Sequence, residues 1–387
     1  MLFGVWAWLF VCLGLGLSIL GPSIPALRAD YALSLGGAGV LFTIHSSGYL
    51  AGVLIAGPLS DRAGRRLVSA VGAAGLAVGM ALAAFSPTWP LFLAAMVPCG
   101  IGFACIDVGL NAAIGDAVSD ARKRAAAMNL LHGAFPLGTL IAPAALALAW
   151  RLGTDWRPTF VAIALVTALG LAPLLLRRPA WPDDALASPE RERPPTATPL
   201  AIVRLLREPS LARLAAIQGL YVGVELGIAG WIATYLIDEF GSSGDAGALA
   251  TSVYWGGFLV GRPITAWLTH RFDPLRLMRW TMAAGLVCGV VGIIAPSAAV
   301  AAAVYVGAAL AICGVFPTVM SLALHGRQRD AGAVTALITA AAACGGLLLP
   351  WLVGAVADAA GLRAAMALTA APLVPMLLLA SGLHSVE

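Results

Sequence analysis

Two groups of polar side chains lie inside apolar segments at spacings that would place each group on one helix face. Asp107 and Asn111 are four residues apart in CIDVGLNAAIGD. Gln218, Tyr221 and Glu225 are separated by three and then four residues. Residues at these spacings share a helix face. An ionised carboxylate at the centre of a bilayer costs at least about 2.5–3.5 kcal/mol. The two groups therefore predict two polar helix faces that line a watery cavity.

A histidine on the following apolar segment is expected to lie near the first group. The turn between the segments 89–116 and 126–150 centres near residue 120, and Asp107 and His132 lie at nearly equal distances from it. In an antiparallel helix pair both would lie roughly 18 Å from the turn. An Asp–His pair there would suit a proton relay or the binding of a substrate hydroxyl. The alternative is a histidine that only packs.

The composition indicates which elements position these groups. The chain has 387 residues, of which 60% are hydrophobic and 11% are charged, whereas soluble domains carry roughly 25% charged residues. Long apolar runs predict an all-α integral membrane protein rather than a β-barrel with alternating strands. Twelve spans are expected near 3–25, 38–57, 67–86, 89–116, 126–150, 158–176, 211–236, 247–269, 279–296, 299–324, 332–356 and 363–383.

The basic residues indicate the orientation. With the N-terminus in the cytoplasm, most of the 23 Lys and Arg residues fall in cytoplasmic loops, as the positive-inside rule requires. We therefore expect a multi-pass protein of the inner (plasma) membrane with both termini in the cytoplasm. The net charge of +4 reflects this bias, and no nucleic-acid partner is expected.

The chain divides into two similar halves. Residues 177–210 are rich in proline and charge and predict a cytoplasmic linker between residues 1–176 and 211–387. SGYLAG at 47–52 recurs as GGFLVG at 256–261, and the same offset of 209 places Arg62 on Arg271. Two parallel six-helix halves form the repeat of one large transporter fold. We expect two pseudo-symmetric six-helix bundles.

GPLSDRAGRR at 57–66 resembles the G-x-L-x-D-R-x-G-R-R loop of the major facilitator superfamily and lies, as in that family, between the second and third spans. With the spans, the linker and the repeat, the resemblance covers nearly the whole chain. It implies a gating loop in which Asp61 pairs with arginines and helix ends, and Gly57 and Gly64 would permit close packing and a tight turn. The alternative is a plain positive-inside loop. The gating residues expected are Gly57, Asp61, Arg62, Gly64, Arg65, Arg66 and Arg271.

Three stretches also resemble a narrower group, the fucose–galactose–glucose:proton symporters and related permeases. They are DVGLN (107–111), NLLHGAFPLG (129–138) and GLYVGVELGIAGWIATYL (219–236). In that group an acid on span 4, followed four residues later by Asn, is implicated in proton coupling, and Asp107 and Asn111 match it. The fucose symporter also has an Asp on span 1, where LGPSIP (20–25) has none. This departure would remove proton coupling or shift it onto Glu225.

These observations predict a secondary active transporter that moves a small polar solute, a hexose or related sugar above all, by alternating access and proton symport. Proton coupling is expected on Asp107, Glu225 and His132. Substrate binding is expected on Asp107, Asn111, His132, Gln218, Tyr221, Glu225, Trp231 and Trp255. The two tryptophans would stack on a sugar ring or anchor the protein at the membrane interface. The expected partners are a sugar-like substrate, protons and membrane lipid, and the protein is expected to be a monomer.

A proton-coupled exporter of drugs or other hydrophobic compounds is the main alternative. Such exporters usually carry an Arg on span 4, but MVPCGIGFACIDVG (96–109) has none. A sugar facilitator without proton coupling is a further alternative. A transport-inactive sensor fits less well, because the tails are short. No nucleophile–base pair, metal-ligand cluster or CxxC spacing appears, so no enzymatic activity, cofactor or metal is expected.

Overall fold

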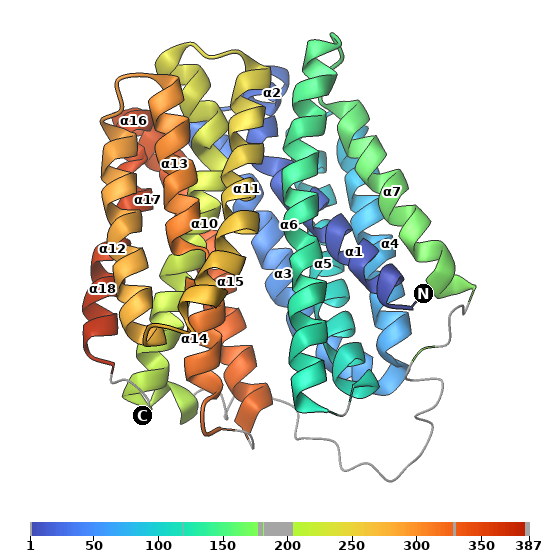
Figure 1. Ribbon diagram of the computed structural model, residues 1–387. Coiled ribbons are helices and arrows are strands. Elements are labelled where there is room, and N and C mark those ends of the chain that lie inside the picture. The colour runs from blue at the N-terminus through green and yellow to red at the C-terminus, as the bar shows by residue number, and fades with distance from the viewer. Residues whose placement is uncertain (1, 119, 177–180, 182–203, 328–329, 384–387) are drawn as a thin grey trace. The chain divides into compact units, whose positions relative to one another are not determined.

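A computed structural model describes residues 2–118, 120–176, 181, 204–327 and 330–383 (Figure 1). The regular structure in these ranges is helical, with no strand. Ten helices are long and apolar enough to cross a membrane, or eleven if one bent pair counts as a single span. The all-α membrane class predicted from the sequence is therefore confirmed.

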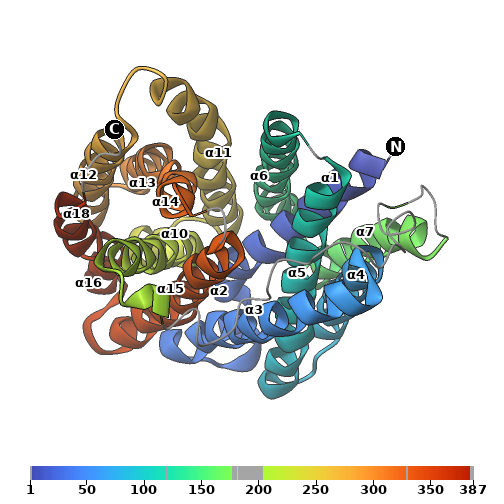
Figure 2. The same cartoon turned by 90° about the horizontal axis from the view of Figure 1, so that it is seen from below.

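The helices of the first half follow the predicted spans within a few residues at most ends. They are α1 (Leu2–Ser18), α2 (Leu20–Tyr31), α3 (Leu35–Ala63), α4 (Arg65–Ala84), α5 (Trp89–Ala117), α6 (Ala121–Arg151) and α7 (Arg157–Leu175). The helices α1 and α2 together form the first predicted span and are bent by 40° relative to each other. In Figures 1 and 2, α4 lies beside α5, and α1 lies beside α6.

The second half repeats this pattern. Its helices are α10 (Pro209–Phe240), α11 (Gly244–Leu268), α12 (Pro274–Ile293), α13 (Ala298–Ile312), α14 (Val315–Leu324), α15 (Ala331–Ala360), α16 (Leu362–Ala365), α17 (Ala367–Ala370) and α18 (Leu373–Ser381). The view in Figure 2 shows α10 among α11, α13, α15 and α18, all of which it contacts. The helix α11 is not among those that pass the length and apolarity test, although it occupies the predicted span 247–269.

Prolines explain two of the breaks inside predicted spans, those in the first and the tenth span. Proline lacks an N–H and its ring clashes with the carbonyl four residues earlier. Pro22 lies four residues after Ser18, where α1 ends, and Pro317 lies four residues after Cys313, between α13 and α14. The first and tenth predicted spans are thus each divided at the position that a proline dictates.

Contacts divide the chain into two compact units. Unit 1 comprises residues 1–26 and 44–193, and unit 2 comprises residues 27–43 and 194–387. The sequence prediction placed 27–43 in the N-terminal bundle, whereas here α2 from Leu27 and the first turns of α3 are grouped with the second half. The predicted linker 177–210 lies largely outside the described residues.

Glycines let helices approach closely within unit 1. A Cβ on Gly102 of α5 would lie 2.5 Å from the Gly72 carbonyl oxygen and 2.5 Å from the Leu76 amide nitrogen of α4. Such small residues at helix contacts allow backbones to meet in membrane proteins. The contact fixes the position of α5, the helix that carries Asp107 and Asn111.

Gly102→Ala is expected to destabilise the protein by about 1–3 kcal/mol, because the new methyl group overpacks a contact with backbone atoms. Gly115→Ala on the same helix is the control, since a Cβ there meets no atom within 4 Å. Thermal unfolding in detergent measures both. Equal midpoints for the two variants would contradict the importance of this contact.

Candidate functional site

Four side chains from three helices of unit 1 form a continuous chain of hydrogen bonds. The Tyr49 hydroxyl of α3 donates to Asp107 Oδ2 at 3.2 Å, and Asn111 Nδ2 donates to Asp107 Oδ1 at 2.8 Å. His132 Nε2 of α6 lies 2.9 Å from Asn111 Oδ1. An amide oxygen only accepts, so His132 Nε2 carries the proton and donates it. Both carboxylate oxygens are therefore satisfied by neutral donors.

Aromatic rings hold the two ends of this chain in place. The His132 ring meets Phe10 of α1 edge-on with centroids 4.9 Å apart, and Tyr49 meets Phe103 of α5 at 5.5 Å. Asp107, Asn111 and Tyr49 are half-buried, while His132 is exposed. The polar chain thus runs from a partly buried carboxylate to an imidazole that solvent or a solute can reach.

Asp107 and His132 were predicted to form a pair, but they are linked through Asn111 and not by a direct hydrogen bond. The prediction placed the two at equal depth as a pair, and the structure does bring them into electrostatic contact. The hydrogen bond from His132, however, goes to Asn111, which is bonded to Asp107 in turn. Equal distance from the turn fixes depth along the helices but not the direction in which each side chain points.

The second polar group lies on α10 in unit 2. Gln218, Tyr221 and Glu225 are 0%, 0% and 8% exposed. Neither the oxygen nor the nitrogen of the Gln218 side chain has a hydrogen-bond partner among the described residues. A buried polar group without a partner costs about 1–3 kcal/mol, and natural proteins satisfy such groups with water or a ligand. This glutamine is a candidate ligand-binding group.

The helix α11 supplies the neighbours of Glu225. The Tyr254 hydroxyl donates to the Glu225 carbonyl oxygen at 3.1 Å. Arg262 of α11 and Tyr221 of α10 both interact electrostatically with the Glu225 carboxylate. The Glu225 carboxylate could therefore accept a hydrogen bond from a solute, or exchange its interaction with Arg262 for one with a solute.

The two predicted tryptophans lie in the core of unit 2. The Trp231 indole N–H donates to the Pro350 carbonyl oxygen at 2.7 Å, and its ring lies 6.4 Å from that of Phe42. Trp255 is 1% exposed and packs against Tyr254 and Phe258. Both tryptophans were predicted either to anchor the protein at the membrane interface or to stack on a sugar ring. In this structure both side chains are buried, and the Trp231 N–H is used in a hydrogen bond within the protein.

Several predicted gating residues join α3, α4 and α5. Arg65 Nε lies 3.0 Å from Asp116 Oδ2, and its Nη1 donates to Ser60 Oγ at 2.9 Å. Gly64 has φ +91° between α3 and α4, which meets the predicted need for a tight turn. The close packing expected at Gly57 is not found, because a Cβ there would meet no atom within 4 Å.

The remaining gating residues are less tightly placed. Arg62 is exposed and Arg66 is half-buried. Arg271, the counterpart of Arg62 in the second repeat, is exposed and stacks on Trp267 at 4.3 Å from the ring centroid. The Asp61 side chain lies outside the described part of the chain.

Two residues of the site were missed by sequence reasoning. Tyr49 gave no local signal, because its partner Asp107 lies 58 residues away. Arg262 did give one, since a charge inside the apolar segment GGFLVGRPITAW marks a functional position in membrane proteins. Within the described ranges, no group of three or more His, Cys, Asp or Glu side chains is placed to hold a metal ion.

Comparisons with known proteins agree with this fold. Multidrug resistance protein MdtL of Escherichia coli O9:H4 (strain HS) is 27% identical over 344 residues, covering 88% of this chain and 85% of MdtL. A bacterial homolog of the human lysosomal transporter Spinster, inward-facing and occupied, matches with a TM-score of 0.80 and 17% identity over 98% of this chain and 95% of that one. The E. coli xylose transporter XylE, in a partially occluded inward-open conformation, matches with a TM-score of 0.77 and 17% identity over 97% of this chain and 95% of that one.

The sequence itself also matches a family model. The model described as Major Facilitator Superfamily aligns with residues 6–335, which is most of the chain. The structural matches, at their low identity, show the fold, and the family model shows the relationship. This protein therefore belongs to the Major Facilitator Superfamily of secondary transporters.

Proposed function

We propose that this protein is a proton-coupled symporter of a small polyhydroxylated solute, a hexose or a related sugar, in the manner of the fucose–galactose–glucose:proton symporters. Family membership supports transport itself. The observation that carries the choice of solute is the hydrogen-bonded chain Tyr49–Asp107–Asn111–His132, which ends at an exposed imidazole. Sugar hydroxyls both donate and accept, so they suit alternating amide, carboxylate and imidazole groups.

Asp107 is the proposed proton carrier. An amide such as Asn111 does not pass protons on, so the bond from His132 to Asn111 favours the hydroxyl-binding role of His132 over a direct relay. The proton then reaches Asp107 through water. When Asp107 is protonated, the span carries no charge through the bilayer, which lowers the cost of moving the loaded carrier.

Glu225 and Gln218 form the proposed second binding group. Gln218 offers an amide without internal partners, and Glu225 offers a carboxylate 8% exposed beside Arg262. The Gln218 amide could donate to a solute hydroxyl or accept from it, and the Glu225 carboxylate could accept from one. The inner-membrane location and the cytoplasmic termini remain part of this proposal on the strength of the basic loops. The monomeric state stays a prediction.

Extrusion of hydrophobic compounds is the second candidate, because the relative MdtL is named as a multidrug resistance protein. Uptake in proteoliposomes separates the two. We expect saturable uptake of one member of a hexose panel, stimulated by an inward proton gradient. Proton-driven export of lipophilic cations, with no sugar uptake, would overturn the proposal in favour of the exporter.

Glu225→Gln is expected to weaken sugar binding by about 1–3 kcal/mol, or roughly 5-fold to 160-fold in the dissociation constant, because a charged acceptor is lost from a buried site. Glu208→Gln is the matched control at the start of the same helix, where the carboxylate is 47% exposed and pairs with Arg327. Calorimetric titration in detergent measures both. Unchanged affinity in Glu225→Gln would remove Glu225 from the binding group.

A further inference from the structure

A cavity of about 420 Å³ opens beside the start of α10, within unit 2. Three parts of the chain line it: the first turns of α10 with Ser210 and Leu214, the end of α14 from Leu322 to Arg327, and Leu383 after α18. Small-molecule sites in proteins span about 300–1,000 Å³. The cavity is therefore large enough for a small organic ligand.

The cavity combines an apolar floor with a polar mouth. Leu214 and Leu383 are buried, whereas Ser210 and His325 are exposed. The Arg327 side chain is 26% exposed. An occupant would therefore place its polar group near the mouth and a neutral part over the leucines.

The polar groups at the mouth are hydrogen-bond donors of three kinds. Arg327 Nη2 donates to Ser210 Oγ at 3.4 Å, so the guanidinium and the hydroxyl lie side by side. His325, which follows the last residue of α14, lines the same cavity. A guanidinium has five N–H donors and an imidazole at least one. Ser210 also lies in the first turn of α10, and helix starts favour anions. Together these groups have the chemistry of a phosphate site.

Arginines cover the groups here that would repel an anion. The helices α14 and α18 both end beside the cavity, and a helix end carries a partial negative charge. Arg327 Nη1 donates to the Ala323 carbonyl oxygen of α14 at 3.2 Å. Arg213 donates to the Gly382 carbonyl oxygen just after α18. The carbonyl ends of both helices are thus paired with positive charge.

The surroundings of the cavity are basic. Arg279 of α12 donates to the Leu383 carbonyl oxygen at 2.9 Å, which places the start of α12 beside the cavity. Six arginines and three acids lie in the described segments around it, at 204–213, 273–279 and 325–330. One of the acids, Glu208, pairs with Arg327 at 3.1 Å and is 47% exposed. Exposed pairs of this kind are weak, so an anionic ligand can replace Glu208 as the partner of Arg327.

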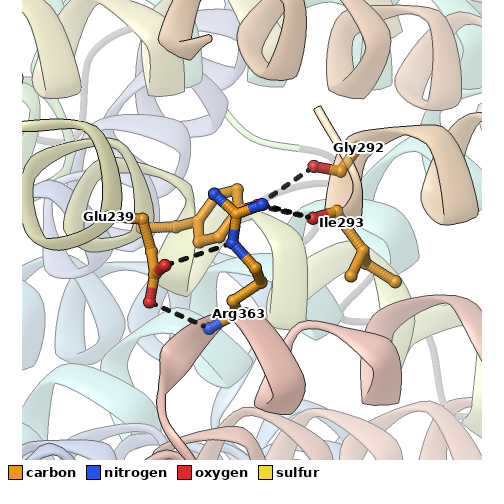
Figure 3. A network of polar contacts seen from close by, with 5 residues as sticks. Glu239, Gly292, Ile293 and Arg363 are labelled. Carbon is orange, nitrogen blue, oxygen red and sulfur yellow. Dashed lines mark hydrogen bonds and ion pairs between the residues drawn. The ribbon is translucent and has the colours of Figure 1, made fainter. Parts of the chain in front are cut away.

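An arginine at the other end of α10 shows a contrasting environment. Arg363 of α16 donates to Glu239 Oε2 at 3.2 Å and to the Ile293 carbonyl oxygen at 3.4 Å, as Figure 3 shows. Its guanidinium also lies 5.2 Å from the centre of the Phe240 ring. The protein's own groups thus enclose Arg363, whereas Arg327 lines an open cavity.

We propose that this cavity binds a phosphate group carried by a partly apolar molecule, with Ser210, His325 and Arg327 donating to the phosphate oxygens. The tetrahedral oxygens of a phosphate suit donors from two helices better than a planar carboxylate does. A free phosphate ion would leave the leucines uncovered. Two sources carry this chemistry: an anionic phospholipid of the surrounding membrane, and a soluble phosphate ester on the side predicted to be cytoplasmic. Binding here does not depend on which solute is transported.

The test measures the thermal unfolding midpoint of the full chain in a non-ionic detergent. The probes are dioleoylphosphatidylglycerol and phenyl phosphate, and the controls are dioleoylglycerol and potassium chloride of equal ionic strength. A ligand of the folded state raises the midpoint once its concentration exceeds its Kd. We expect a saturable rise with at least one probe, beyond that with either control. A rise with the lipid alone identifies a lipid site, and a rise with phenyl phosphate identifies a site open to soluble esters.

Four variants locate the binding. Arg327→Gln should raise the Kd about tenfold and His325→Ala about threefold, because bonds from a charged donor are the stronger ones. Glu208→Gln should lower the Kd about threefold, since a competing anion is lost. Arg276→Gln is the matched control and should stay within about twofold, because Arg276 is exposed at the start of α12 and does not line the cavity.

Each Kd is taken relative to the variant's own ligand-free midpoint, so a less stable Arg327→Gln does not decide the result. His325→Ala approaches the cavity from an exposed residue and gives a second, independent reading. The absence of a saturable rise with both probes would overturn the proposal. An equal loss of affinity in Arg276→Gln and Arg327→Gln would also overturn it, because binding would then reflect only the general positive charge of this end.

Discussion

Asp107→Asn is expected to abolish proton-driven accumulation of the substrate and to leave substrate exchange intact. Asparagine resembles the protonated acid in shape and can still bond Tyr49 and Asn111, which flank Asp107 at 3.2 and 2.8 Å. With one proton per solute, a gradient of one pH unit supports up to about tenfold accumulation. The variant should reach a ratio of one.

Counterflow measured beside gradient-driven uptake tests this expectation, with Glu225→Gln as the companion variant. Counterflow without accumulation in Asp107→Asn assigns the proton to Asp107. If Asp107→Asn accumulates fully and Glu225→Gln does not, the two acids have the opposite roles. If both accumulate fully, neither carries the proton and Asp107 only binds substrate.

Asp61→Asn is expected to lower the turnover rate at least about tenfold, equivalent to about 1.4 kcal/mol in the barrier, with little change in substrate affinity. The substitution keeps the size of the side chain and removes the charge that the gating loop would use. Exposed ion pairs are worth only about 0–1 kcal/mol, so an effect of this size would mean that the pair is shielded in the closed gate.

Asp155→Asn is the matched control for Asp61→Asn, since Asp155 pairs with Arg157 at 2.9 Å with side chains 51% and 38% exposed. Initial rates and half-saturation concentrations of uptake are compared for the two variants. Wild-type turnover in Asp61→Asn would reject the gating role and leave a plain positive-inside loop.

The helices could be predicted from the sequence because apolar runs of this length have few alternatives in a membrane protein. The run from Trp89 predicted a helix over 89–116, and α5 covers Trp89–Ala117. The shared face of Asp107 and Asn111 followed from local spacing, and their side chains do meet at 2.8 Å. The breaks after Ser18 and at Cys313 were missed, although Pro22 and Pro317 encode them.

Contacts between distant segments could not be predicted in this way. Spacing along one helix does not show which residue of another helix reaches the same point, so Tyr49 was missed as a partner of Asp107. The bond from Trp231 to Pro350 spans 119 residues and has no local pattern. Asp358 gave no local signal either, because its partners are the backbone N–H groups of Leu35 and Gly36, which lie more than three hundred residues away.

The length of α3 gives its first turn a large mechanical leverage. The helix has 29 residues, so it is about 44 Å long at 1.5 Å per residue, and a tilt of about 10° around its far end would move its first turn by roughly 7.5 Å. The Leu35 and Gly36 N–H groups each donate to Asp358 of α15 at 2.8 Å, and hydrogen bonds of this length do not survive such a displacement. One acid at the end of α15 therefore limits the tilt of a helix that is 29 residues long.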